Sequence, residues 1–179
     1  MDKERDRARQ GSFAWQRISP FKDWFELRAG GRVLATLTLG GLAITTARVQ
    51  TNDRHLVFTA EGIGNQRIRI SDSTSDTLIV AYFERRSGHA GTLRFVDGGH
   101  LEWRRTGWWK PTYAFTDRWG NPLARFHPDG RVADYVPSED PGSSTGGWQD
   151  LLLLLALGWF LLVITGGALP PKLTSPVVQ

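Results

Sequence analysis

Apolar and polar residues alternate along most of this chain, between about residues 12 and 136. Arg32–Leu39 has apolar residues at alternate positions, and in Arg67–Ile70 isoleucines alternate with arginines. Successive side chains of a β-strand point to opposite faces of the sheet, so this period of two predicts strands with one buried and one solvated face. Glycine, asparagine or aspartate follows most of the runs, as expected of turns between strands.

About eleven or twelve strands are expected, and no helical pattern interrupts them. Because no helix connects consecutive strands, the pattern favours an antiparallel meander over a parallel sheet. Asp97-Gly98-Gly99, which lies between two of the runs, is a strong hairpin signal. The predicted strands are Trp24–Arg28, Arg32–Leu39, Leu42–Val49, His55–Ala60, Gln66–Ile70, Thr77–Phe83, Thr92–Val96, His100–Arg104, Thr112–Thr116, Leu123–Phe126 and Arg131–Val136.

The pattern changes at Leu151–Leu169, a leucine-rich segment without any charged side chain. A helix that is hydrophobic on all sides needs an apolar host, which is either a membrane or the interior of a protein. The length suits a bilayer, so one alternative is a tail-anchored single-pass membrane protein, spanning at 151–169, with a cytoplasmic β domain. Trp159 near the middle and Asp150 beside the segment favour a protein interior, because membrane tryptophans prefer the interfaces and cytoplasmic flanks are basic.

The preferred interpretation joins the two parts of the chain into one mainly β fold, a closed antiparallel barrel of about 12 strands around a central hydrophobic C-terminal helix. Such a barrel has a radius of about 12 Å, too wide for side chains alone to fill, and a helix about 10–12 Å across fits inside it. The small residues of the helix are then either points of close approach for large inward side chains or simply tolerated: Ala156, Gly158, Gly166 and Gly167.

The expected domain organisation follows from these segments. Residues 1–11 form a disordered leader, residues 12–168 form a single domain that includes the central helix at 148–168, and residues 169–179 form a tail. With 179 residues, the chain is long enough for one domain with a sizeable core.

Composition and charge limit the cellular setting. The 22 Lys and Arg and 18 Asp and Glu residues are interspersed, and the net charge of +4 gives a modest attraction to phosphates or anionic lipid surfaces. The absence of cysteine excludes disulfides and thiolate metal sites and suits a reducing compartment. The charged segment Met1–Gln10 lacks the apolar core of a secretory signal. We therefore expect a cytoplasmic protein, associated with membranes if it binds lipid.

No constellation of catalytic or metal-ligating residues stands out. The 4 histidines are far apart, and none has a partner at the spacing of a helical zinc motif: His55, His89, His100 and His127. The adjacent carboxylates Glu139-Asp140 lie in a stretch rich in serine and glycine, which favours a solvated linker. We expect a non-enzymatic protein without a cofactor or metal.

One stretch combines basic and aromatic residues where predicted strands end. Arginines at loop ends beside exposed indoles suit the phosphate-bearing headgroup of an anionic phospholipid at a membrane surface. The same composition can stack nucleic-acid bases, which is the less favoured partner. In the purely structural alternative, the tryptophans cap the barrel core and the stems of the arginines cover them. The candidate headgroup-binding residues are Arg85, Arg86, Arg104, Arg105, Trp108, Trp109 and Lys110.

Several of these features together resemble a known family. A strand at Tyr113–Asp117 that runs into the turn RWGNPL at Arg118–Leu123, within a twelve-stranded meander ending in one leucine-rich helix, is similar to the tubby-like C-terminal superfamily. Trp148–Val163 looks like the closing helix of its bacterial relatives. The superfamily includes tubby proteins, plant LURP-one-related proteins and phospholipid scramblases. The resemblance covers roughly residues 13–168 and implies a helix threaded through a closed barrel. Tubby proteins bind phosphoinositides, and scramblases are associated with lipid movement and calcium. This chain has no scramblase-like calcium loop and no cysteine, so the resemblance does not carry those activities over.

Overall fold

A computed structural model of the protein describes residues 13–19, 21–40, 44–74, 78–133 and 148–167. The predicted leader at 1–11, the stretch that contains Glu139-Asp140 and the predicted tail at 169–179 lie outside these residues.

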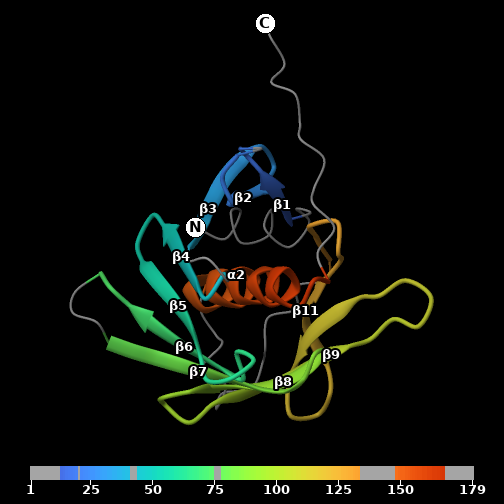
Figure 1. Ribbon diagram of the computed structural model, residues 1–179. Helices are drawn as coiled ribbons and strands as arrows, with labels where there is room; N and C mark the ends of the chain where they lie inside the picture. The colour runs from blue at the N-terminus through green and yellow to red at the C-terminus, as the bar shows by residue number, and fades with distance from the viewer. Residues whose placement is uncertain (1–12, 20, 41–43, 75–77, 134–147, 168–179) are drawn as a thin grey trace, which may run out of the picture.

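Twelve antiparallel strands form a closed barrel, which confirms the predicted mainly β fold and its strand number (Figure 1). Each strand pairs with the next one along the chain, and the last strand pairs with the first. The closing pair is short, with Phe13 opposite Val132 and Ala14 opposite Arg131. The strands are β1 (Phe13–Arg17), β2 (Trp24–Ala29), β3 (Arg32–Gly40), β4 (Thr46–Thr51), β5 (His55–Glu61), β6 (Arg67–Asp72), β7 (Leu78–Ser87), β8 (Ala90–Phe95), β9 (His100–Arg105), β10 (Tyr113–Thr116), β11 (Pro122–Phe126) and β12 (Arg131–Ala133).

The alternating pattern has the predicted outcome: apolar side chains face the interior of the barrel, and polar side chains face solvent. Leu37 of β3 and Ile68 and Ile70 of β6 are completely buried, whereas the arginine that begins β6, Arg67, is exposed. The predicted strand Leu42–Val49 is wrong at its start, because β4 begins only at Thr46. Ile44, before that strand, has a φ of 49°, which is incompatible with extended backbone.

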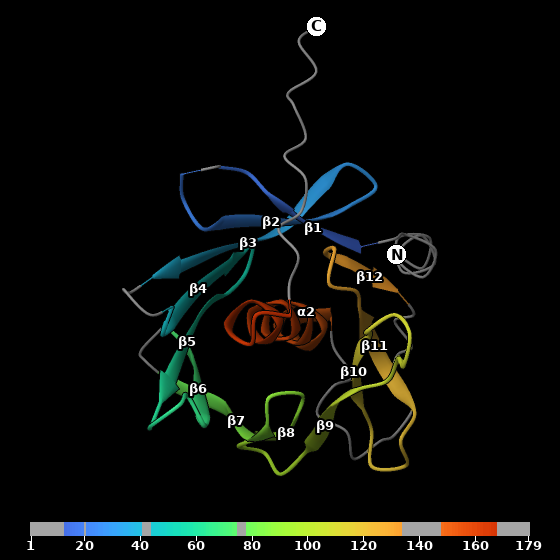
Figure 2. The same cartoon turned by 45° about the vertical axis from the view of Figure 1, so that its right-hand side comes forward.

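The one helix of the described residues, α2 (Trp148–Ile164), is buried from Leu151 to Leu162. It contacts β3, β4, β10 and β11, which lie on different parts of the barrel wall. Figure 2 shows the strands arranged around α2. The indole Nε1 of Trp15 donates a hydrogen bond of 3.2 Å to the Leu155 carbonyl, which links β1 directly to the helix backbone.

The helix ends at Ile164, four residues before the predicted end at 168. Gly166 adopts a φ of 69°, and the N–H of Gly167 donates a 2.8 Å hydrogen bond to the Leu162 carbonyl. This left-handed glycine is a helix C-cap, which stops the helix although the sequence beyond it stays apolar. Within the described residues, no helix is both long enough and apolar enough to cross a membrane.

Aromatic side chains pack α2 against the wall. Trp159 stacks on Trp15 with ring centroids 6.4 Å apart and meets Phe25 edge-on at 5.6 Å. Gly158 lies so close to Phe126 that a Cβ built there would stand 2.3 Å from the ring. The prediction of close approach at the small helix residues is therefore confirmed at Gly158. A Cβ built at Gly166 would meet no atom within 4 Å, and this glycine instead forms the helix C-cap.

Candidate functional site

The loop between β9 and β10 projects two tryptophans into solvent. Trp108 and Trp109 are 87% and 92% exposed, and Figure 1 shows this loop, in yellow, extending away from the barrel wall. The interpretation that these tryptophans cap the core is therefore wrong. The buried indole of this region is instead Trp103 of β9, which stacks on Tyr113 with centroids 5.5 Å apart.

Hydrogen bonds close the base of this loop. The N–H of Thr106 donates to the Thr112 carbonyl at 2.8 Å, and the two hydroxyls lie 2.9 Å apart. At Gly107 a Cβ would lie 1.9 Å from the Lys110 carbonyl oxygen, so only glycine fits this tight turn. A loop that is closed at its base and turned sharply at Gly107 holds its two indoles outward.

The predicted basic residues lie on the strand ends beside this loop but do not form one cluster. Arg105 donates a 3.2 Å hydrogen bond through Nε to the Gly107 carbonyl and so lies against the loop itself. Arg104 extends in the other direction, where its Nη2 donates to the Gly120 carbonyl at 3.0 Å. Lys110 is exposed within the loop. Arg105, Trp108, Trp109 and Lys110 therefore form one continuous surface, which we call the tryptophan loop.

The two arginines of β7 have different surroundings. Arg86 forms an ion pair with Glu102 of β9. Arg85 is partly buried, and its Nη1 donates a long 3.4 Å hydrogen bond to the Gly64 carbonyl in the loop between β5 and β6. Burial lowers the pKa of the Arg85 guanidinium, which nevertheless stays charged at neutral pH. Its Nη2 is buried without a hydrogen-bond partner within the described residues.

A shallow depression of about 330 Å³ lies on the outer wall beside these strands. Arg86 and Arg104 line it, and Arg118 stacks on the Trp119 ring at 4.0 Å in the adjoining turn. Glu102 also lines it and accepts a 2.8 Å hydrogen bond from the Thr92 hydroxyl. Both basic and acidic side chains line this depression, and Arg86 and Arg104 already contact oxygen atoms of the protein.

The turn beneath the depression is organised by Asp117. Its carboxylate accepts the N–H groups of Trp119 at 2.9 Å and Asn121 at 2.8 Å. Burial raises the pKa of Asp117, but the hydrogen bonds from Asn121, Trp119 and Gly120 outweigh that effect and leave the pKa below its usual value. The RWGNPL turn is therefore held by a carboxylate that stays ionised, which is a structural role.

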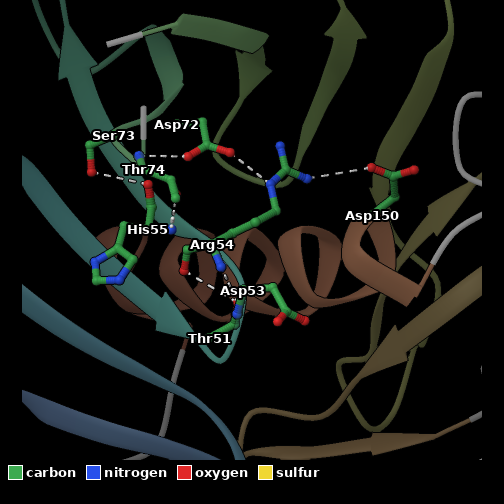
Figure 3. A network of polar contacts seen from close by, with 8 residues as sticks. All are labelled: Thr51, Asp53, Arg54, His55, Asp72, Ser73, Thr74 and Asp150. Atoms are coloured by element: carbon green, nitrogen blue, oxygen red, sulfur yellow. Dashed lines mark hydrogen bonds and ion pairs between the residues drawn. The ribbon is translucent and has the colours of Figure 1, made fainter. Parts of the chain in front are cut away.

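A second polar network, which the sequence did not reveal, lies where α2 begins (Figure 3). Arg54, in the turn after β4, donates through Nε to Asp72 of β6 at 2.8 Å, and its Nη1 lies 3.9 Å from Asp150 in the first turn of α2. An acidic residue in the first turn also suits the helix dipole. One guanidinium thus ties the helix start to two hairpins. In the sequence, the only indication of this network was the position of Asp150 at the start of the apolar segment.

Metal-ligating residues are not gathered anywhere in the part of the chain that the structure describes. His55 and His100 begin β5 and β9, whereas His89 and His127 lie in turns at the opposite end of the barrel. His89 contacts the ring of Tyr113, with centroids 5.8 Å apart.

The chain was compared with protein-family models, curated proteins and solved structures. None of the three comparisons found a match to this chain.

Proposed function

We propose that this protein is a non-enzymatic barrel that binds anionic phospholipid surfaces through its tryptophan loop. The observation that carries the proposal is the pair of adjacent, almost fully exposed indoles, Trp108 and Trp109, between two cations, Arg105 and Lys110. Large exposed aromatic side chains are costly in water, and a surface that keeps them is a candidate for contact with an apolar phase.

The chemistry of the loop fits the boundary between lipid and water. Indole rings favour the headgroup level, because the ring is apolar and its N–H still finds a polar partner there. Cations next to the rings interact with lipid phosphates, each contributing roughly 1 kcal/mol near an anionic surface. Arg85 and Arg86 lie on β7, two strands away from β9, and add positive charge to the same side of the barrel, although Glu102 offsets part of it.

The rest of the fold acts in this proposal as a rigid frame for the loop. We propose that α2 is the central core of the barrel, as in the tubby-like superfamily that the sequence resembles. The burial of Leu151–Leu162 and the hydrogen bond from Trp15 to the helix backbone support this role. A wall that is packed on the inside can present a loop without changing shape.

Vesicle co-sedimentation tests the proposal. We expect the full chain to pellet with phosphatidylcholine vesicles that contain phosphatidylserine, and less so as salt is added, because salt screens charge attraction. The double variant Trp108→Ala/Trp109→Ala and the charge-reversed Arg105→Glu/Lys110→Glu should each bind at least about tenfold more weakly.

Two control variants separate a specific effect from a general one. Trp119→Ala removes an exposed indole elsewhere, and Arg48→Glu reverses an exposed charge on the outer face of β4. Both should bind as the unmodified chain does. If the loop variants pellet as well as the controls, or if they lose affinity for single-stranded DNA and keep it for vesicles, the proposal is wrong.

A further inference from the structure

The topology of the barrel places alternate hairpin loops at the same end. Every strand is antiparallel to its neighbours and consecutive strands are adjacent, so the β1–β2, β5–β6 and β9–β10 loops share one end. The turns after β4, β8 and β10 share the other end. Gly167, just beyond α2, lies beside the Tyr113 hydroxyl at the first end, whereas Asp150 lies beside Arg54 at the second.

The β1–β2, β5–β6 and β9–β10 loops each expose a large apolar side chain at the tip. Phe21 in the β1–β2 loop and Ile63 in the β5–β6 loop are both 94% exposed, like the indoles of the β9–β10 loop. The Ser19 hydroxyl accepts the N–H of Phe21 at 3.3 Å. Gly62 and Gly64, with φ of 82° and 75°, form the turn around Ile63. These tips are therefore held outward by local turns.

The three tips are evenly spaced around the rim. Four strands separate the β1–β2 loop from the β5–β6 loop, four more lead to the β9–β10 loop, and the last four return to the start. With strands about 4.8 Å apart and tilted by about 40°, neighbouring tips are roughly 25 Å apart along the rim. The three loop tips therefore define a plane across the end of the barrel.

Charge distinguishes this end from the other. Lys22, Arg67 and Lys110 are exposed in or beside the three loops. The acidic residues of the hairpins at this end are paired in the described structure, Asp23 with Arg17 at 2.8 Å, Glu61 with Arg69 at 2.9 Å and Asp129 with Arg131 at 2.8 Å.

The turns at the other end carry the acidic residues Asp53, Asp97 and Asp117 and the basic residues Arg54 and Arg118, so their charges are mixed. We call the two ends the basic end and the mixed end.

We propose that the barrel docks end-on, with its basic end against an anionic bilayer and Phe21, Ile63 and the tryptophan loop inserted as three separate anchors. This inference rests on the proposed lipid binding and extends it from one loop to a whole face. A fluid bilayer accepts single side chains at widely spaced points, whereas a protein partner needs a continuous buried patch. The basic charge between the anchors complements the anionic headgroups.

Site-directed fluorescent labels test this orientation, and the absence of cysteine from the chain makes each introduced cysteine unique. Phe21→Cys, Ile63→Cys and Trp109→Cys place an environment-sensitive label on each anchor. Leu78→Cys and Val96→Cys place it at the mixed end, where both residues are also exposed. On phosphatidylserine-containing vesicles we expect a blue shift and quenching by bromolipids for the first three labels, and neither for the last two.

The results separate this inference from the proposed function. Labels at 109 that respond while those at 21 and 63 do not would leave single-loop binding intact and overturn end-on docking. Equal responses at both ends would also overturn it, because insertion would then lack orientation. No response at any label, together with no pelleting, would overturn both proposals.

Discussion

Gly158 shows how tightly single residues are constrained where α2 meets the wall. Alanine is the better helix former by about 1 kcal/mol, so an isolated helix would gain from Gly158→Ala. In this protein the added methyl group would stand 2.3 Å from the Phe126 ring, and overpacking of this kind costs about 1–3 kcal/mol.

We therefore expect Gly158→Ala to lower the free energy of unfolding by about 1–2 kcal/mol, measured by urea denaturation. Combining it with Phe126→Leu, which makes room for the methyl group, should recover part of the loss in a double-mutant cycle. A more stable Gly158→Ala single variant would show that the helix does not pack against Phe126.

Asp72 is a residue whose charge state should affect the stability of the fold. Burial raises the pKa of its carboxyl, but hydrogen bonds from Thr74 and Arg54 outweigh this and hold the pKa below its usual value. A group with a depressed pKa in the folded state stabilises the protein above its unfolded pKa of about 3.9, and this contribution is lost as the pH falls through the folded value.

The expected result is a stability gap between the unmodified chain and Asp72→Asn that is present at neutral pH and narrows below about pH 4. Because the ion pair with Arg54 is partly solvated, the gap should be about 1 kcal/mol or less. Asp53→Asn, an exposed position in the adjacent turn, is the matched control and should show no such gap. Chemical denaturation at a series of pH values measures both.

The tryptophans show where the alternation of apolar and polar residues stops predicting the orientation of a side chain. Trp103 lies two residues after buried Leu101 on β9, so its inward orientation follows from the period of two. Trp108 and Trp109 lie beyond the strand, where that period no longer applies, and the tight turn at Gly107 decides where they point.

At the scale of elements, the proposed role of α2 as the central core means that the barrel should depend on this helix. Its buried leucines contribute to one continuous core with the inward residues of the strands. Trp15 and Arg54 attach it to the wall, one at its middle and one at its start. The strands have no comparable apolar partner if the helix is removed.

Deleting residues 148–179 should therefore leave a chain that aggregates or unfolds, because even one large-to-small core substitution costs 2–5 kcal/mol. Deleting only 168–179 retains α2 and is the matched control, which should fold. Circular dichroism and size-exclusion chromatography distinguish the two. A folded, soluble product of the longer deletion would instead favour the tail-anchored alternative.

At the scale of the whole molecule, barrel closure creates two chemically different ends from one meandering chain. Because consecutive strands are antiparallel, the loops after β1, β5 and β9 lie on one rim, and the short pairing of β1 with β12 closes that rim. Residues as distant in sequence as Phe21 and Trp109 then belong to one face. The tryptophan loop is therefore one part of a larger surface at a single end of the barrel.

The pattern of residues predicted most of the strands, their approximate number and the need of the apolar segment for an apolar host, because the hydrophobic period and the cost of exposing leucine are local properties of the chain. The strand at Phe13–Arg17 was not among those predicted. Folding in three dimensions was needed to show that β1 pairs with β12, that Gly166 ends the helix and that Arg54 reaches Asp72 and Asp150. It also separated Arg86 and Arg104 from the tryptophan loop, although they are its close neighbours in the barrel wall. These outcomes depend on contacts between residues far apart in sequence and on where side chains point beyond strand ends, which no periodicity encodes.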